Sequence, residues 1–464
     1  MDVILPAPRH DDRVGDMSHS GSFPSNFLFG TASSSYQVEG ATKEDGRGAS
    51  IWDSFCLIPG KVLHGHTGDI ANDQYHRYEE DVELMRGLGV GAYRFSLAWP
   101  RIFPNGYGEK NPLGFDYYHR LIDELLSQGI EPVVTLYHWD LPQRLEDEGG
   151  WPSRETAQRF ADYAELCFRE LGDKVKMWIT LNEPFCTSIL GYYTGIHAPG
   201  RRDMKDAFRA IHHLNLAHGL ALESFRDSGQ EGIVGTSLNL NTPRPATRSA
   251  EDLLSADRAA DRDSRMFLDP LFGMGYPKRL LEAYPEIELP ILDGDLDLIS
   301  GKIDFLGLNY YHEQATTYDS RHPEGYRYVQ TWHPTTDMGW DIVPSGLYRQ
   351  LEWVHTRYPS IDLYITENGC AFPDRLTEDG KRCHDFERID YLRKHFRVCS
   401  QAIERGIRLK GYFLWSIIDN FEWSLGYTKR IGIVYCDYSD QRRIPKDSYY
   451  YYREVVAGHE ELEP

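Results

Sequence analysis

The stretch VKMWITLNE, residues 175–183, is apolar and β-branched for most of its length and ends on a glutamate, Glu183. A second stretch, LYITENG at 363–369, places another glutamate, Glu367, beside an asparagine near its end. Neither stretch alternates simply between apolar and polar residues, which is typical of strands buried on both faces of a parallel sheet. Each therefore predicts a strand. A carboxylate at the end of a buried strand adds little to stability, so it indicates a functional role.

Six further runs resemble these two, and amphipathic segments separate them along the chain. The runs are FLFGTASS, AYRFSLAW, EPVVTLYHW, IVGTSLNL, IDFLGLNYY and GYFLWSIID. The segments 75–89, 116–129 and 385–406 carry apolar residues at spacings of three and four and end in glycine, which predicts helices. Strands and helices in alternation predict an α/β fold, a single (β/α)8 TIM barrel with long βα loops. A doubly wound open sheet competes, but the first strand leads into GTASSSYQVEG, which lacks a GxGxxG turn.

The 464 residues show no internal repeat, linker or low-complexity segment, so one folded domain is expected. Residues 1–22 are rich in Pro, Asp, His, Ser and Gly and show no periodicity. They predict a flexible N-terminal tail, followed by a barrel catalytic domain at 23–464.

Composition limits the partners and the compartment. The net charge of -21 argues against nucleic acid and anionic membranes as partners, and no apolar run reaches the length of a membrane span. Seven cysteines, an odd number without CxxC spacing, rule out a full disulfide framework and give no reason to expect a metal. The sequence shows no signal peptide and no N-glycosylation sequon, so a cytoplasmic protein is expected. The oligomeric state stays open.

Glu183 and Glu367 are expected to face each other across the mouth of the barrel. Functional side chains of such barrels lie at the C-terminal ends of the strands, and these glutamates end the fourth and seventh. Two converging carboxyls suit the cleavage of a glycosidic bond, in which one protonates the leaving oxygen and the other acts ionised on the oxocarbenium-like carbon. The two carboxyls need different pKa values for these roles, and Arg94 in the second strand is a buried cation suited to holding one of them ionised.

Other strand ends add polar and aromatic side chains at the same level. Amide, imidazole and carboxylate groups suit hydrogen bonds to sugar hydroxyls, and tryptophan rings suit stacking on a pyranose ring. Any one of these residues could equally belong to the core, and it is their shared position that favours a sugar site. They are Gln37, His138, Trp139, Asn309, Tyr311, Trp415, Glu422 and Trp423.

These strings also carry a resemblance that spans nearly the whole chain. FLFGTASSSYQVEG, GRGASIWDSF, YRFSLAWPRIFP, YHWDLPQ, TLNEP, DFLGLNYY, YITENG and GYFLWSIIDNFEW resemble, in order, the glycoside hydrolase family 1 β-glycosidases. The resemblance implies a retaining, double-displacement mechanism that needs no metal or cofactor. It implies that Glu183 is the general acid/base and Glu367 the nucleophile, which Arg94 and Tyr311 would contact and keep ionised. On this assignment we expect a high pKa for Glu183, beside the like charge of Glu367, and a low pKa for Glu367, beside Arg94.

The resemblance also implies how the sugar is bound. Asn182 would bind the sugar 2-hydroxyl, Trp415 would lie beneath the ring, and Trp340 would line the leaving-group side. The presence of Glu183 favours O-glycosides over thioglucosides, and the charge of Glu422 favours neutral sugars over 6-phosphosugars. The residues implied to bind the remaining hydroxyls are Gln37, His138, Trp139, Glu422 and Trp423.

The expected function is that of a retaining β-glucosidase acting on a small-molecule substrate. Its substrates would be cello-oligosaccharides and aryl or alkyl β-glucosides, with transfer of glucose to alcohols as a side activity. The alternatives within the family are a β-galactosidase, a β-fucosidase or a β-glucosidase for a secondary metabolite. A sugar-binding protein without activity is the remote alternative, and the presence of both glutamates argues against it. The preferred leaving group depends on loops around Thr187, Tyr193, Trp340 and 312–335, which the sequence leaves open.

Overall fold

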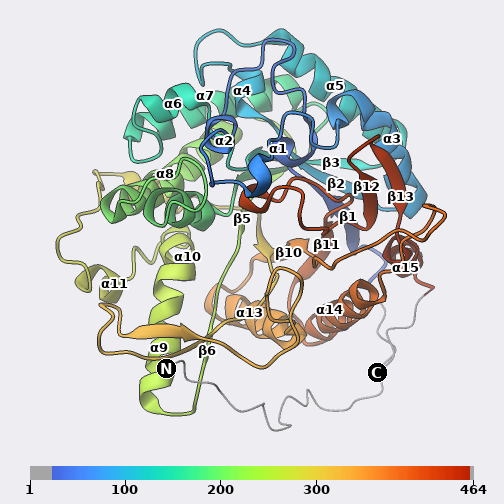
Figure 1. Cartoon of the computed structure of the whole chain (residues 1–464). Coiled ribbons are helices and arrows are strands. Elements are labelled where there is room, and N and C mark those ends of the chain that lie inside the picture. Colours follow the sequence, from blue (N-terminus) through green and yellow to red (C-terminus); the bar gives the residue numbers. More distant parts are fainter. Residues whose placement is uncertain (1–22, 460–464) are drawn as a thin grey trace.

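Eight parallel strands close into a barrel in this computed structural model, which describes residues 23–459 (Figure 1). The strand order is β1-β11-β10-β7-β5-β4-β3-β2. Barrel strands that follow one another along the chain are therefore neighbours, and β1 closes the barrel by pairing with both β2 and β11. The predicted barrel is therefore confirmed, and the open sheet is excluded. The barrel strands are β1 (Leu28–Ala32), β2 (Ala92–Ser96), β3 (Glu131–Tyr137), β4 (Met177–Asn182), β5 (Ile233–Leu238), β7 (Phe305–Asn309), β10 (Asp362–Asn368) and β11 (Leu409–Trp415). The tail predicted at 1–22 lies outside the described residues.

Longer helices follow the barrel strands and cover the outside of the barrel (Figure 1). The helices predicted from apolar spacing are confirmed as α3, α5 and α14, and Gly89, with a φ of 74°, ends α3 in the left-handed region. Phe386, the first apolar residue of the segment predicted at 385–406, is an exception to the predicted apolar face, because at the first position of α14 it is 66% exposed. The helices on the outside of the barrel are α3 (Gln74–Leu88), α5 (Pro112–Ser127), α7 (Arg154–Leu171), α8 (Met204–Asp227), α13 (Pro344–Arg357), α14 (Phe386–Glu404) and α15 (Asp447–Val456).

Further elements occupy the long connections. The helices there are α1 (Ser35–Val38), α2 (Ile51–Cys56), η1 (Leu63–Gly65), α4 (Trp99–Ile102), α6 (Gln143–Asp147), η2 (Cys186–Tyr193), α9 (Ala250–Ala260), η3 (Asp261–Arg265), α10 (Met266–Leu271), α11 (Lys278–Glu282), α12 (Asp295–Ile299) and η4 (Trp423–Leu425). One small sheet contains β6 (Arg244–Pro245), β8 (Ala315–Tyr318) and β9 (Tyr326–Val329), and another contains β12 (Val434–Asp437) and β13 (Arg442–Pro445). None of these elements is among those predicted separately from the sequence.

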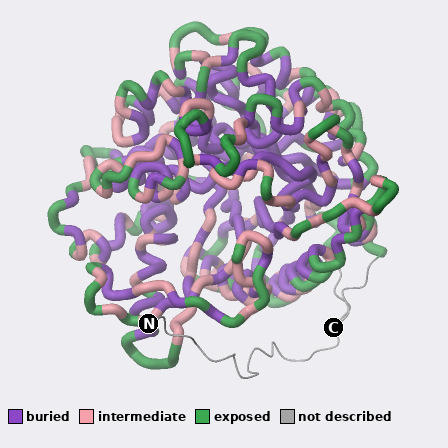
Figure 2. Tube along the Cα trace, viewed as in Figure 1, coloured by how far each residue is buried: buried purple, intermediate pink, exposed green. Residues whose placement is uncertain are grey.

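Two buried clusters of the core hold the barrel strands in place. Side chains such as Ala92, Val133, Ile179, Phe305 and Phe413 form one buried cluster, and a larger cluster joins the strands to the helices. Burial is accordingly concentrated at the centre of the molecule, and exposure at its rim (Figure 2). A rigid barrel fixes where each strand ends, and therefore where side chains at the strand ends point. Among residues 23–459, no helix combines the length and apolar character needed to span a bilayer.

Candidate active site

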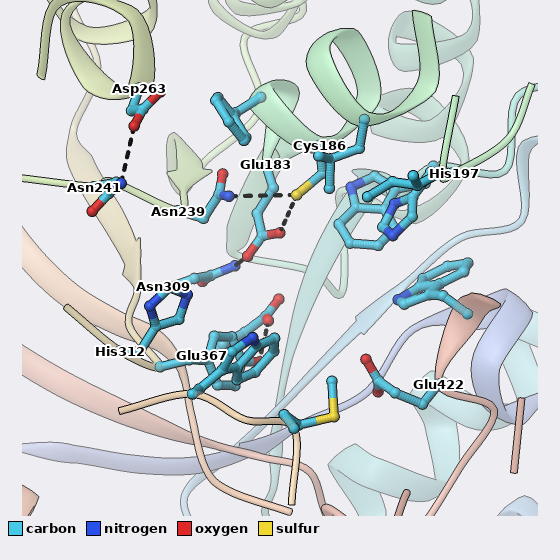
Figure 3. Close-up of a pocket in the computed structure, with 18 of the residues that line it drawn as sticks. Glu183, Cys186, His197, Asn239, Asn241, Asp263, Asn309, His312, Glu367 and Glu422 are labelled. Atoms are coloured by element: carbon cyan, nitrogen blue, oxygen red, sulfur yellow. Dashed lines mark hydrogen bonds between the residues drawn. The ribbon is translucent and has the colours of Figure 1, made fainter. Parts of the chain in front are cut away.

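A cavity of about 570 Å³ is lined by both Glu183 and Glu367 (Figure 3). Glu183 directly follows β4, and Glu367 is the last residue but one of β10. The barrel places β5 and β7 between these two strands, so the carboxyls reach the cavity from well-separated points of its rim. The predicted convergence of the two glutamates on one cavity is confirmed.

Both carboxylate oxygens of Glu367 accept hydrogen bonds from protein donors. Arg94 Nη1 donates to Oε1 at 2.7 Å, and the hydroxyl of Tyr311 donates to Oε2 at 2.7 Å. The neighbouring Tyr310 instead donates to the carbonyl oxygen of Val343. The contacts predicted for Arg94 and Tyr311 are thus present, and the buried guanidinium forms a charge-assisted bond that favours the ionised form of Glu367.

Glu183 is held by neutral donors only. Asn309 Nδ2 donates to Oε1 at 2.7 Å, and the Cys186 thiol donates to Oε2 at 3.1 Å. Asn309 is itself fixed, because its Oδ1 accepts from Ser237 and Thr366 at 2.8 and 2.7 Å. Its second amide hydrogen goes to the side chain of Asn182, so Asn309 is committed to protein contacts and orients Glu183 rather than offering a free group to a sugar.

The electrostatics of the pair differ from expectation in one respect. Burial, followed by the charge of Glu367, raises the pKa of Glu183 to about 8, in the predicted direction. Burial also raises the pKa of Glu367, outweighing the opposing effects of Arg94 and Tyr311. The expectation of a low pKa for Glu367 is therefore wrong, because it left out the cost of burying the carboxylate. Glu367 alone has a direct cationic partner, so we expect it to lose its proton first.

Histidine and tryptophan side chains form one wall of the cavity. The ring of His138 stacks on those of Trp415 and Trp423, with centroids 5.6 and 6.0 Å apart, and Trp139 lies 4.5 Å from Trp423. Burial lowers the pKa of His138 well below its ordinary value, so the imidazole is neutral. Its Nε2 accepts from Asn182 Nδ2 at 3.1 Å, which assigns the hydrogen to Nδ1, a buried atom without a protein partner in the described chain.

Two residues that were predicted to bind the sugar do not line the cavity. Gln37 does not line the described cavity, because its Nε2 donates to Asn420 and to the carbonyl of Phe421 at 3.1 and 2.9 Å. Asn182 lies behind the lining as well, where its Oδ1 accepts from Arg94 Nη2 at 2.6 Å. Their contacts with a sugar stay predictions.

Two more predicted residues do line the cavity. Trp340 stacks against His312 with ring centroids 5.4 Å apart, and it lies 5.2 Å from the ring of Tyr311. Glu422 lines the cavity, and burial, followed by the charge of Glu367, raises the pKa of its carboxyl to about 8. Both positions fit a molecule bound next to the glutamates.

Three residues of the cavity wall have left-handed backbone. Trp139, Glu183 and Trp423 have φ values of 76°, 47° and 49°. Positive φ is uncommon for residues with a side chain, and such residues concentrate at functional sites. The barrel therefore holds these side chains in directions that a relaxed backbone would not give them.

Several residues that line the cavity were not predicted from the sequence. Gln314 and Tyr328 fall within the segment 312–335 that was flagged only as a loop, and Cys186 comes three residues after Glu183. The rule of strand C-termini would have indicated Asn239, directly after β5. The polar lining residues that were missed are Cys186, His197, Asn239, Asn241, Arg262, Asp263, His312, Gln314, Tyr328 and Ser424. No cluster of three or more His, Cys, Asp or Glu side chains suited to a metal occurs in residues 23–459.

Comparison with known proteins assigns the class. A family model described as glycosyl hydrolase family 1 matches residues 19–461, so the chain belongs to that family. Beta-glucosidase A of Thermotoga maritima is 48% identical over 437 residues, covering 94% of this chain and 98% of the relative. A bifunctional beta-D-glucosidase/beta-D-fucosidase of Bifidobacterium breve is 45% identical over 460 residues, with coverages of 94% and 98%. The solved family 1 β-glucosidase from Thermotoga maritima superposes with a TM-score of 0.92 at 47% identity, covering 95% and 99% of the two chains.

Proposed function

We propose that this glycoside hydrolase is a retaining β-glucosidase that removes terminal β-D-glucosyl residues from cello-oligosaccharides and from aryl or alkyl β-glucosides. The related β-glucosidases support the choice of sugar. The observation that carries the proposal is the asymmetry of the two glutamates in one cavity. Arg94 and Tyr311 hold both oxygens of Glu367, whereas Glu183 has only neutral donors.

The asymmetry divides the roles in a double displacement. In the first step, Glu367 attacks the anomeric carbon while Glu183 gives its proton to the leaving oxygen, and a glycosyl-enzyme ester forms. A pKa of about 8 keeps Glu183 protonated at neutral pH, as this step requires. In the second step, Glu183 takes a proton from water, which attacks the same carbon and releases Glu367. An alcohol in place of water gives transglycosylation.

We assign the terminal sugar to the part of the cavity beside Glu422. There the wall of His138, Trp139, Trp415 and Trp423 would supply an imidazole N–H and aromatic faces. With a pKa of about 8, Glu422 is mainly neutral at pH 7 and can both donate to and accept from sugar hydroxyls. Glu422 therefore repels a 6-phosphosugar fully only above about pH 8. The preference for neutral sugars that its charge predicts is accordingly weaker at neutral pH.

We further propose that the enzyme acts in the cytoplasm on short products of cellulose degradation. All seven cysteines lie in the described part of the chain, and each is a buried free thiol. Free thiols throughout a chain are typical of reducing compartments.

The stereochemistry of azide rescue tests the assignment of the roles. Glu367→Ala should abolish hydrolysis, and added azide should restore turnover of an activated aryl β-glucoside and give the α-glucosyl azide. Glu183→Ala is the matched variant, in which the glycosyl-enzyme still forms from a good leaving group, so azide should give the β-glucosyl azide. NMR of the products distinguishes the two. A β-azide from Glu367→Ala would overturn the assignment of the nucleophile.

A β-D-fucosidase activity is the second candidate, because the Bifidobacterium breve relative is named for both activities. Measuring kcat/KM on p-nitrophenyl β-D-fucoside beside the glucoside tests it. A fucoside rate below about a hundredth of the glucoside rate, a difference of about 3 kcal/mol, would remove this candidate.

A further inference from the structure

Asn368 directly follows Glu367 at the end of β10 and has no part in the reaction as proposed above. Its side chain is fully buried and does not line the described cavity, so any role in catalysis must act through another residue. A buried amide group destabilises the fold unless its hydrogen-bonding atoms are paired. The partners of Asn368 therefore indicate what it holds in place.

The β10 strand bulges at Glu367, which lines the cavity. Next to β7, Ile365 and Glu367 pair with consecutive residues, so β10 carries one extra residue between them. Next to β11, the register shifts again between Ile365 and Asn368. A bulge interrupts the regular ladder of hydrogen bonds and redirects the side chains of its strand. The direction of Glu367 therefore depends on contacts beyond the ladder.

The side chain of Asn368 supplies such contacts on both sides of β10. Its Nδ2 donates to the carbonyl oxygen of Tyr310, directly after β7, at 2.5 Å. Its Oδ1 accepts from the hydroxyl of Tyr412, in β11, at 2.6 Å. Its second amide hydrogen is donated to the hydroxyl oxygen of Tyr391, on α14, at 2.9 Å. Asn368 thus joins the bulged strand to both of its neighbours and to a helix outside the barrel.

Tyr391 extends these contacts to Tyr311, the residue whose hydroxyl donates to the Glu367 carboxylate. The hydroxyl of Tyr391 donates to the carbonyl oxygen of Tyr311 at 3.3 Å, and its ring stacks on His395 with centroids 3.9 Å apart. The peptide groups before and after Tyr311 are therefore both held, one by Asn368 and the other by Tyr391. The Tyr311 hydroxyl donates in turn to Glu367 Oε2 at 2.7 Å, so the contacts that start at Asn368 end on the carboxylate of the residue beside it.

We propose that Asn368 and Tyr391 are positioning residues, which hold Glu367 in the geometry for attack on the anomeric carbon. A nucleophile must lie about 3–3.5 Å from the atom that it attacks, and a misplacement of about 1 Å can lower the rate about 100-fold. Neither residue lines the described cavity, so their loss should slow the reaction without weakening the binding of the sugar. The inference rests on the proposed role of Glu367 as the nucleophile, which it deepens by naming the residues that aim it.

Removal of one hydroxyl tests the proposal. Tyr391→Phe keeps the ring stacked on His395 and removes the bond to Tyr311. We expect kcat on p-nitrophenyl β-glucoside to fall about fivefold, the effect of one lost hydrogen bond, and KM to change less than about twofold. Tyr452→Phe is the matched control, because the buried hydroxyl of Tyr452, on α15, also donates to a backbone carbonyl, that of Gly30 in β1. The control should change neither constant.

Asn368→Leu removes all three side-chain bonds at similar side-chain size. It should lower kcat further than Tyr391→Phe does, because the bulge then loses its contacts with both neighbouring strands. A folded Asn368→Leu variant with the kcat of the wild type would contradict the proposal. Should this variant not fold, Tyr391→Phe decides alone.

Azide rescue distinguishes the positioning of Glu367 from a general effect on the fold. In Glu367→Ala, azide takes the place of the carboxylate, so Asn368 and Tyr391 have no nucleophile to hold. Adding Tyr391→Phe to this variant should therefore change the azide-rescued rate less than about twofold. An equal fall in both backgrounds, or an unchanged kcat for Tyr391→Phe alone, would rule out the positioning role. A Glu367→Ala variant that azide does not rescue would instead overturn the role of Glu367 in the proposed function, and this inference with it.

Discussion

Replacing Cys186 by alanine should shift the pH dependence of catalysis, because Cys186 is one of the two residues that donate hydrogen bonds to the Glu183 carboxyl. The thiol donates to Oε2 at 3.1 Å, and burial raises its own pKa well above the ordinary value, so it stays a donor at neutral and mildly alkaline pH. A donor to a carboxylate stabilises the ionised form and lowers the pKa, as it does here. Cys186→Ala should therefore raise the pKa of Glu183.

The size of the shift follows from the strength of the bond. A hydrogen bond to a charged group contributes about 1.5–3 kcal/mol, and a thiol is a weak donor, so about 1 kcal/mol is reasonable. At about 1.36 kcal/mol per pKa unit, this is about 0.7 units. Glu183 must be protonated to act as the acid, so the alkaline limb of kcat/KM should move up by that amount.

The assay is the pH profile of kcat/KM on cellobiose, whose poor leaving group requires the acid. Cys186→Ser keeps a donor, and because a hydroxyl donates more strongly than a thiol, the limb should stay at or below that of the wild type. Cys399→Ala, which changes a buried cysteine on α14, is the control for lost packing and should leave the limb in place. An alkaline limb that stays fixed or moves down in Cys186→Ala would refute the reasoning.

Three further predictions concern charge and packing at the same site. Arg94→Met should raise the acidic limb of kcat/KM by about 1 unit or more, because Glu367 loses its cation and must still ionise; an unmoved limb would contradict this. Glu422→Gln should gain about 1–2 kcal/mol over the wild type at pH 9 but not at pH 5, because a carboxyl whose pKa the fold raises to about 8 destabilises the fold as it ionises; melting temperatures at both pH values check this. Gly369→Ala should lower the free energy of unfolding by about 3 kcal/mol in urea titrations, since its Cβ would lie 1.7 Å from the Trp415 carbonyl oxygen.

The parts of this site that the sequence predicted are those fixed by the barrel itself. A strand buried on both faces shows as a short apolar run, and the rule that function lies at strand C-termini then placed Glu183 and Glu367 in one cavity. The contact between Arg94 and Glu367 was predicted from the family resemblance instead, because Arg94 lies in the middle of β2 rather than at its C-terminal end. The convergence of the two glutamates depends only on strand order.

The parts that the sequence did not predict depend on contacts between loops. Asn241 follows β5, whereas Gln314 and Asp263 come from two later connections, and only the folded chain brings the three together. The direction of the pKa shift of Glu367 was missed for a related reason. Burial raises this pKa and the cation Arg94 lowers it, and a sequence motif does not show which effect is larger. Strand ends can be found from local pattern, but the packing between connections cannot.

The left-handed backbone at Trp139, Glu183 and Trp423 lowers the stability of the enzyme at positions that its activity requires. Each such residue costs the fold about 1–2 kcal/mol, which glycine would avoid. Glu183→Gly would in addition remove a buried carboxyl that the fold disfavours in its charged form. Directed evolution that selects only for heat resistance should therefore accumulate changes at these three positions and return robust barrels that no longer cleave glucosides.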